Sequence, residues 1–184
     1  MKLPRLLASC ALTAVTATVS AQHAAPIQPI SGLDVQRYVG RWYEIAKFPN
    51  RFQRKCVADT SADYSVMPEG GLRVVNRCRL ESGQMDQAIG VARQIGGDSS
   101  AKLEVRFAPA WLSFVPFVWG DYWIVDLDRA YELAAVSEPK REYLWILSRS
   151  PAVDEGRYAA LLGRLTAMGL DVGKLEKTAQ GNPR

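Results

Sequence analysis

The chain has 184 residues, of which 48% are hydrophobic and 23% are charged, and its formal net charge at pH 7 is +4. This composition is typical of one globular domain, and it excludes intrinsic disorder, collagen-like repeats and a membrane protein with several spans. His23 is the only histidine, so a His-rich zinc site and most His-dependent catalysis are excluded, and we expect no metal and no cofactor.

The first 21 residues have the pattern of an export signal. A basic start is followed by an uncharged, mostly apolar run that ends in Val19-Ser20-Ala21, a small-residue cleavage site. Alternatively, Leu7-Ala8-Ser9-Cys10 fits a bacterial lipobox, which would place a lipid anchor on Cys10. Both alternatives predict export, to the periplasm or to the periplasmic face of the outer membrane. The mild positive charge of the remaining chain does not suggest nucleic acid as a partner.

The middle of the chain has the pattern of an all-β domain. Residues 22–32 are rich in Pro and Ala and predict a tether, and strand-like runs then alternate with turn signals such as Pro68-Glu69-Gly70-Gly71. The eight predicted strands cover 40–48, 57–67, 72–80, 84–95, 101–108, 121–128, 131–137 and 142–149. Short turns between sequential strands favour an eight-stranded up-and-down antiparallel β-barrel, because closure removes exposed edges.

One segment near the C-terminus changes its period. Apolar residues recur with helical spacing from Tyr158 to Met168, acidic residues precede them, and Gly169 follows as a stop. This predicts an amphipathic α-helix over about 154–168, packed on the outside of the barrel. A short last strand is expected around 174–180, and residues 181–184 form a tail.

Three motifs stand out along the predicted strands: Gly40-Arg41-Trp42 within GRWYEIAKFPNRFQ, Leu127-Asp128 with Tyr131, and LWILSRSP with Arg149. Together they resemble the signatures of the lipocalin family, and in particular those of the bacterial outer-membrane and apolipoprotein D-like lipocalins. The second motif departs from the usual Thr-Asp-Tyr, since Tyr131 follows three positions after Asp128. The resemblance covers about 33–180. It implies a non-catalytic protein, reported as homodimers in the family, that binds, stores or transports fatty acids, phospholipids or lysophospholipids in the bacterial cell envelope for membrane maintenance.

The strand order brings the three motifs to one end of the barrel. Gly40, Trp42, Asp128 and Arg149 are therefore expected to be structural, with the Arg149 guanidinium over the indole of Trp42 closing that end by a cation–π contact.

Strand alternation assigns the inward positions of the predicted barrel. The predicted ligand-cavity residues are Ala46, Phe48, Tyr122, Ile124, Tyr143, Trp145 and Leu147, with Tyr122 and Ile124 resting on the family resemblance. An apolar slot with polar tips suits an acyl chain, although these rings could instead fill the interior. Glu44 also faces inward, and no partner for its carboxylate can be named from the sequence.

The opposite end is predicted to be an apolar mouth with basic residues around it. Its expected mouth or lid residues are Phe52, Trp111, Phe114, Phe117 and Trp119. The apolar 109–120 loop is a lid, a dimer contact or a membrane contact. Four basic residues of the same mouth could steer anionic head groups, namely Lys47, Arg51, Arg54 and Lys55.

Two cysteines remain after signal removal, and in an oxidising compartment we expect a Cys56–Cys78 disulfide. A straight hairpin register would place Cys78 nearer Thr60, so the bond requires the first loop to fold over. Two alternative functions stay open. One is a lipocalin-type enzyme that acts on a lipid through Glu44 or a free cysteine, and the other is a tetrapyrrole- or pigment-binding protein without an inward His ligand.

Overall fold

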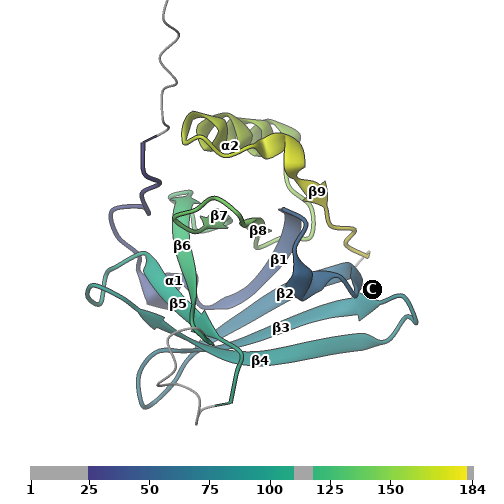
Figure 1. Cartoon of the computed structure of the whole chain (residues 1–184), viewed down its shortest axis with the longest axis horizontal. Coiled ribbons are helices and arrows are strands. Elements are labelled where there is room, and N and C mark those ends of the chain that lie inside the picture. The colour runs from purple at the N-terminus through teal and green to yellow at the C-terminus, as the bar shows by residue number, and fades with distance from the viewer. Residues whose placement is uncertain (1–24, 110–117, 182–184) are drawn as a thin grey trace, which may run out of the picture.

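The computed structural model describes residues 25–109 and 118–181 (Figure 1). The predicted signal, residues 182–184 of the predicted tail and the candidate residues Cys10, Trp111, Phe114 and Phe117 lie outside the described residues.

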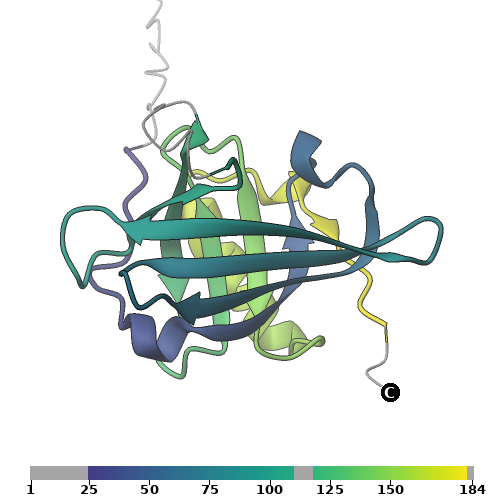
Figure 2. The same ribbon diagram turned by 90° about the horizontal axis from the view of Figure 1, so that it is seen from below.

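Eight antiparallel strands close into a barrel (Figures 1 and 2). They are β1 (Gly40–Lys47), β2 (Cys56–Val66), β3 (Leu72–Leu80), β4 (Met85–Gln94), β5 (Lys102–Arg106), β6 (Gly120–Leu127), β7 (Leu133–Ser137) and β8 (Leu144–Ser148). Each strand pairs with the next, and pairings of β1 with both β8 and β2 close the sheet. Each strand of this ring therefore has a neighbour on both sides over at least part of its length, and the sheet closes on itself. The predicted up-and-down barrel is confirmed.

The helices lie at the ends and on the outside of the barrel. They are α1 (Val35–Tyr38), the 3₁₀ turn η1 (Arg51–Gln53), α2 (Glu155–Ala167) and the 3₁₀ turn η4 (Val172–Lys174), and a short strand β9 (Glu176–Lys177) follows. The predicted C-terminal helix is present as α2, whereas α1 and η1 were not predicted. Both short helices are capped by side chains, since Asp34 and Asn50 accept hydrogen bonds from the backbone that follows them. Within the described ranges, no helix has the length and apolar character needed to cross a membrane.

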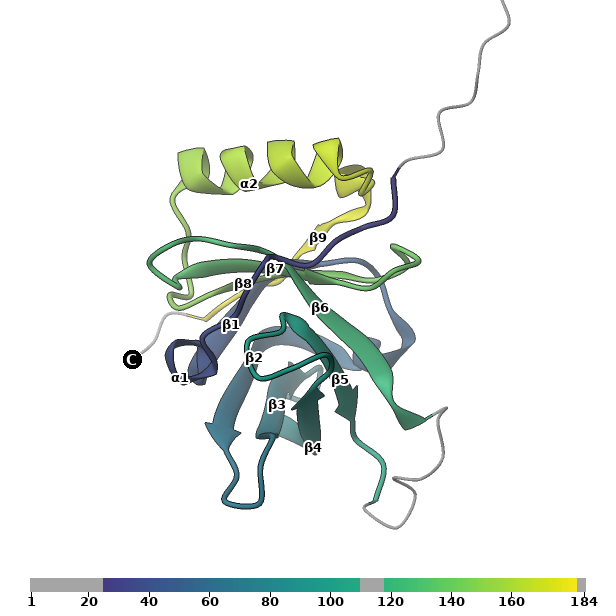
Figure 3. The same ribbon diagram turned by 90° about the vertical axis from the view of Figure 1, so that its left-hand side faces the viewer.

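Two hydrophobic clusters pack on opposite faces of the sheet. The inner cluster fills the barrel from its base and includes Trp42, Leu103 and Ile124. The outer cluster lies between the barrel and α2, where Leu161 and Leu165 of the helix are fully buried. Figure 3 shows α2 lying across the outer face of β7 and β8. The helix therefore covers one side of the barrel and leaves the two ends to other segments.

The structure corrects the inward assignment of Ala46 and Phe48. Both belong to the outer cluster, with exposed fractions of 0% and 4%. The cause is a β-bulge, because Glu44 pairs with Leu147 but Ala46 already pairs with Ile146. The extra residue, Ile45, reverses the alternation of faces beyond it. The alternation of inward and outward residues that starts at Trp42 therefore predicts the correct face only as far as Glu44.

The expected tether is packed against the barrel from residue 25 onward. Ile27 is 3% exposed in the outer cluster, and the backbone N–H of Ile30 donates to the carbonyl of Ile124 at 2.9 Å. Burial of Ile27 and partial burial of Ile30 hold the segment on the barrel, in place of the free linker that its Pro and Ala content suggested.

Candidate ligand-binding site

The closed end of the barrel is built around Arg149 and Trp42. The guanidinium carbon of Arg149 lies 4.0 Å from the centre of the Trp42 ring, so the predicted cation–π contact is present. The guanidinium also donates to the carbonyls of Arg37, Tyr38 and Arg41 at 2.7–3.1 Å, which ties β8 to α1 and β1. Gly40 has a φ of +97°, and a Cβ there would lie 3.2 Å from Arg149 Nη1. This position requires glycine both for its backbone and for the space that Arg149 occupies.

Asp128 stabilises the same end from another direction. Its carboxylate accepts hydrogen bonds from the backbone N–H groups of Glu132 and Leu133 and forms an ion pair with Arg157 of α2 at 2.6 Å. The side chain thus holds the β6–β7 turn and the start of the helix together. Trp42, Asp128 and Arg149 all make contacts that organise the fold at this end.

Three tyrosines form a polar row inside the barrel. The hydroxyl of Tyr122 lies 3.0 Å from that of Tyr38 and 2.8 Å from that of Tyr64. Burial raises the pKa of Tyr64 to about 12, and it raises the pKa values of Tyr38 and Tyr122 well above 10. The phenols therefore stay protonated at neutral pH. The three hydroxyl groups supply three O–H donors, but the two hydrogen bonds among them use only two. One O–H remains to donate to another group. On β3, the buried Oδ1 of Asn76 has no hydrogen-bond partner among the residues that the structure describes.

Above the tyrosines, aromatic rings lead from the interior to the mouth. Tyr122, Ile124, Trp145 and Leu147 contact or belong to the inner cluster, as their predicted inward orientation requires. The ring of Tyr143 stacks on Trp145 with 5.7 Å between the centroids, and Phe52 follows at 5.6 Å from Tyr143. Phe52 is 58% exposed. This column of rings reaches from half-buried Trp145, packed against the inner cluster, to solvent-exposed Phe52.

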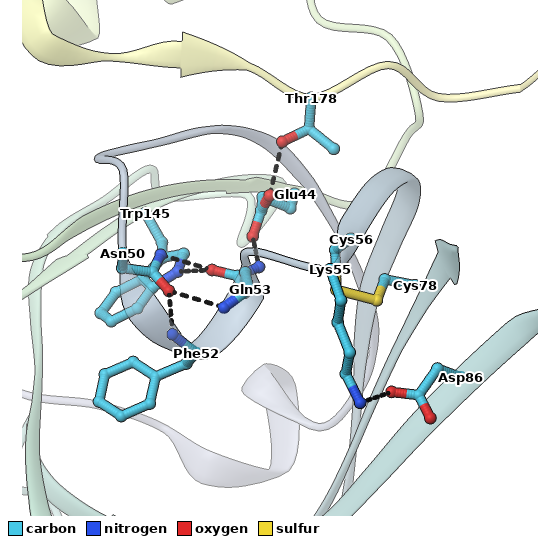
Figure 4. Close-up of a disulfide and its surroundings, with 10 residues drawn as sticks. All are labelled: Glu44, Asn50, Phe52, Gln53, Lys55, Cys56, Cys78, Asp86, Trp145 and Thr178. Carbon is cyan, nitrogen blue, oxygen red and sulfur yellow. Dashed lines mark hydrogen bonds and ion pairs between the residues drawn. A yellow bond between two sulfur atoms is a disulfide. The ribbon is translucent and has the colours of Figure 1, made fainter. Parts of the chain in front are cut away.

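Glu44 has partners that the sequence could not identify (Figure 4). It is 2% exposed, and its two carboxylate oxygens accept from Gln53 Nε2 and Thr178 Oγ1, each at 2.5 Å. Burial raises the pKa of the Glu44 carboxyl, and the two hydrogen bonds and the charge of Lys47 oppose that rise. Gln53 in turn accepts from Trp145 Nε1 at 2.8 Å. Gln53 therefore couples the buried carboxylate to the aromatic column.

The predicted disulfide joins Cys56 and Cys78, whose Cα atoms are 5.5 Å apart (Figure 4). The pairing of β2 with β3 shifts twice between Cys56 and Ser61, so Cys56 lies opposite Leu80 and diagonal to Cys78. These two bulges bring Cys56 close to Cys78, which a straight pairing of the two strands would not do. In this bond neither cysteine is a free thiol, so Glu44 is the remaining candidate group of the enzyme hypothesis.

The far side of the mouth carries the predicted mouth residue Trp119 together with Phe107, Arg93 and Arg106, which sequence reasoning missed. Phe107 is 42% exposed, and its ring lies so close to Gly90 that a Cβ on Gly90 would be 2.7 Å from it. Trp119 is contacted by two guanidiniums, with Arg93 at 4.1 Å and Arg106 at 5.1 Å from the ring centre. The predicted fifth strand, 101–108, already contained Phe107, and alternation from Leu103 and Val105, which lie in or against the inner cluster, would have assigned it to the inner face. In the described part of the chain, no group of three or more His, Cys, Asp or Glu residues is placed to hold a metal ion.

Comparison with known proteins agrees with this architecture. The family described as a Lipocalin-like domain matches residues 33–180. The chain is 41% identical to temperature-induced lipocalin-1 of Arabidopsis thaliana over 85% of this chain and 84% of that protein. It is 37% identical to outer membrane lipoprotein Blc of Escherichia coli (strain K12) over 94% of this chain and 93% of that protein.

Two further proteins extend the likeness. Apolipoprotein D of Mus musculus is 34% identical over 85% of this chain and 82% of its own length. The structure of insecticyanin from the tobacco hornworm Manduca sexta matches with a TM-score of 0.67 at 18% identity over 87% of both chains, a likeness of fold. The resemblance seen in the three sequence motifs is confirmed, and the chain belongs to the lipocalin-like family.

Proposed function

We propose that this protein binds fatty acids or single-chain phospholipids inside its barrel and serves lipid storage or transport in the bacterial cell envelope. Membership of the lipocalin-like family implies binding of a lipid or another small hydrophobic ligand. The observation that carries the proposal is the aromatic column of Phe52, Tyr143 and Trp145, which offers apolar surface from the solvent-exposed mouth to the inner cluster.

The driving force is the removal of an acyl chain from water. Each buried methylene contributes about 0.8 kcal/mol, so a long chain binds well without any charged contact. The protonated tyrosine row, Tyr38, Tyr64 and Tyr122, adds hydroxyl groups at the deep end of the interior. Such a mixture of apolar walls and few polar groups is typical of sites for small hydrophobic ligands.

The location of the proposed activity rests on the N-terminal sequence and on the relatives. Residues 1–21 have the export pattern, and relatives at 37% identity are outer membrane lipoproteins. A lipid carrier at the periplasmic face of the outer membrane would serve membrane maintenance. Whether the export signal is cut after Ala21 or Cys10 carries a lipid decides between a free and an anchored carrier.

Replacement of Trp145 tests the binding site. We expect Trp145→Asp to abolish binding of oleic acid and of lyso-phosphatidylcholine in calorimetric titration, because a carboxylate would have to be desolvated beside the chain. The matched control is Ile89→Asp, since Ile89 is 50% exposed and its partner Val75 lies on the outer face of the sheet. Both variants must retain the circular dichroism spectrum of the barrel. Unchanged affinity of folded Trp145→Asp would contradict the proposed site.

The native state of the carrier is accessible by native mass spectrometry of protein purified from the envelope fraction. The masses would report the mature N-terminus, a lipid on Cys10, the bound ligand and a homodimer in one measurement. A protein isolated without any lipid, and unable to take up oleic acid afterwards, would contradict lipid carriage.

A further inference from the structure

A buried oxygen on the inner face of the barrel has no partner, although most buried polar atoms in proteins are hydrogen-bonded. It is Oδ1 of Asn76, for which the structure shows no hydrogen bond within residues 25–109 and 118–181. Asn76 lies on β3 two residues after Val74, which belongs to the inner cluster. Alternation along the strand therefore directs the Asn76 side chain into the barrel. Apolar contacts with an acyl chain give this oxygen no role.

The side chains on either side of Asn76 are small. The residues paired with Asn76 are Ala62 on β2 and Ala88 on β4. Ala62 belongs to the inner cluster, so the three side chains lie on the inner face of the sheet. Ala88 is nevertheless exposed, which shows that solvent reaches the inner face at this position. A ligand that enters the barrel from the mouth can therefore reach the Asn76 amide.

The tyrosine row provides an unused donor next to this oxygen. Tyr64 is paired with Val74, so Tyr64 and Asn76 are diagonal neighbours on the inner face. The Cα atoms of such neighbours are about 7–8 Å apart, a separation that an aromatic side chain can span. The two contacts of the row fit donation from Tyr38 to Tyr122 and from Tyr122 to Tyr64, which leaves the O–H of Tyr64 unused. One donor and one acceptor without partners thus face the same part of the interior.

We propose that Tyr64 and Asn76 bind a hydroxyl group carried on the hydrocarbon chain of the ligand, an inference that rests on the proposed function and names hydroxylated acyl chains as the preferred ligand class. A hydroxyl matches this pair because it accepts one hydrogen bond and donates another through the same oxygen. It accepts from the Tyr64 O–H and donates to Asn76 Oδ1. An unsubstituted chain leaves both protein groups buried and unpaired, which is costly.

The depth of Asn76 in the barrel determines where on the chain the hydroxyl must lie. Asn76 is four residues from Leu80, the last residue of β3 at the mouth, which corresponds to about 13 Å at the rise of a β-strand. When the carboxylate of a fatty acid lies at the mouth, this depth corresponds to the middle of a stearic acid chain. The protein should therefore prefer a hydroxyl near the middle of the chain, and a hydroxyl next to the carboxylate should give no gain.

Calorimetric titration of the wild-type protein with four acids of one chain length measures this preference. The acids are stearic, 2-hydroxystearic, 10-hydroxystearic and 12-hydroxystearic acid. We expect 10- or 12-hydroxystearic acid to bind about tenfold more tightly than stearic acid, an effect typical of the net gain from buried hydrogen bonds. 2-Hydroxystearic acid should bind like stearic acid. Equal affinity for all four acids would overturn this proposal and leave the lipid site intact, whereas binding of none of them would overturn the proposed function as well.

Two variants test the donor and the acceptor separately. Asn76→Leu keeps a similar side-chain size without polar atoms, and Tyr64→Phe removes only the hydroxyl. Each should lower the affinity for the preferred hydroxy acid to that for stearic acid, while stearic acid binds at least as tightly as to the wild-type protein. The matched controls Gln87→Leu and Tyr43→Phe, next to inward Ala88 and Trp42 and thus on the outer face, should keep the tenfold preference. A preference that survives in either folded variant would overturn the proposal.

A ketone in place of the hydroxyl separates the two hydrogen bonds. An oxostearic acid with its ketone at the preferred position can accept from Tyr64, but it cannot donate to Asn76. The wild-type protein should therefore bind the oxo acid more weakly than the hydroxy acid. Asn76→Leu offers no acceptor, so the two acids should bind this variant equally. Equal binding of both acids to the wild-type protein would show that Asn76 accepts no hydrogen bond from the ligand and would overturn the proposal.

Discussion

At the scale of single residues, the buried carboxylate of Glu44 shows how the mouth is organised. Its position inside the barrel was predictable from alternation with Trp42, but its partners were not. Gln53 comes from a 3₁₀ turn that the sequence pattern does not indicate, and Thr178 comes from the far end of the chain. A buried carboxylate keeps its place only when such donors meet it.

The raised pKa of Glu44 makes the stability of the protein depend on pH. Because burial raises the pKa in the folded state, the folded protein holds this proton to higher pH than the unfolded chain does. The resulting stabilisation is complete below the unfolded pKa and is lost as the pH rises through the folded pKa. Glu44→Gln is neutral at every pH. We therefore expect the free energy of unfolding of Glu44→Gln, relative to wild type, to increase as the pH rises above the unfolded pKa of about 4.3 and through the raised folded pKa.

Urea unfolding at a series of pH values measures this difference. The absolute stability of Glu44→Gln also reflects altered hydrogen bonds with Gln53 and Thr178, and that offset does not depend on pH, so the slope is the quantity to compare. Glu69→Gln, in the exposed β2–β3 turn, is the control. A constant difference between Glu44→Gln and wild type over this range would show that the carboxyl is not shifted.

At the scale of elements, sequence periodicity predicted strands and the long helix well because each buries one face. It failed where one extra residue reverses the alternation. Ile45 lies between alternating residues and gives no local signal of a bulge, so Ala46 and Phe48 were assigned to the wrong face. The pairing of β8 with β7 has no bulge. Alternation therefore assigns Trp145 and Leu147 correctly, and both lie in or against the inner cluster.

This difference in orientation predicts that two large aromatic residues act on different properties. Phe48 is 4% exposed in the outer cluster, so Phe48→Ala should lower the free energy of unfolding by about 3 kcal/mol through the cavity it leaves. Its lipid affinity should stay at the wild-type value. Trp145→Ala should instead weaken oleic acid binding. Urea unfolding and calorimetric titration of both variants, at a temperature at which each is folded, measure the two effects. Loss of affinity in folded Phe48→Ala would place its ring in the ligand site.

At the scale of the whole molecule, β1 pairs with β2 only from Gly40 to Tyr43, at the base of the barrel. The arrangement of residues at this base could be predicted from the sequence, whereas that at the mouth, where the two strands diverge, could not. The base follows from motifs that lie within single strands, such as Gly40 and Trp42. The mouth is completed by chain ends and by bulges, and Gln180 illustrates this because its amide donates to the carbonyls of both Glu44 and Thr60. Neither a motif nor strand alternation connects Gln180 to Glu44 or Thr60, so these contacts leave no pattern in the sequence.

The Cys56–Cys78 disulfide stabilises this mouth by limiting the unfolded chain. It closes a loop with a sequence separation of 22, for which loop-closure entropy predicts a stabilisation of about 3 kcal/mol. We expect dithiothreitol to lower the urea midpoint of the wild-type protein accordingly, and the double variant Cys56→Ala/Cys78→Ala to unfold at that lower midpoint with or without reductant. Because Cys56 directly follows the 51–55 segment, amide exchange of Gln53 and Lys55 should accelerate in the reduced protein, while that of Trp42 at the base should change less. Equal midpoints for oxidised and reduced wild-type protein would show that the bulged register of β2 and β3 already holds the first loop in place without the covalent bond.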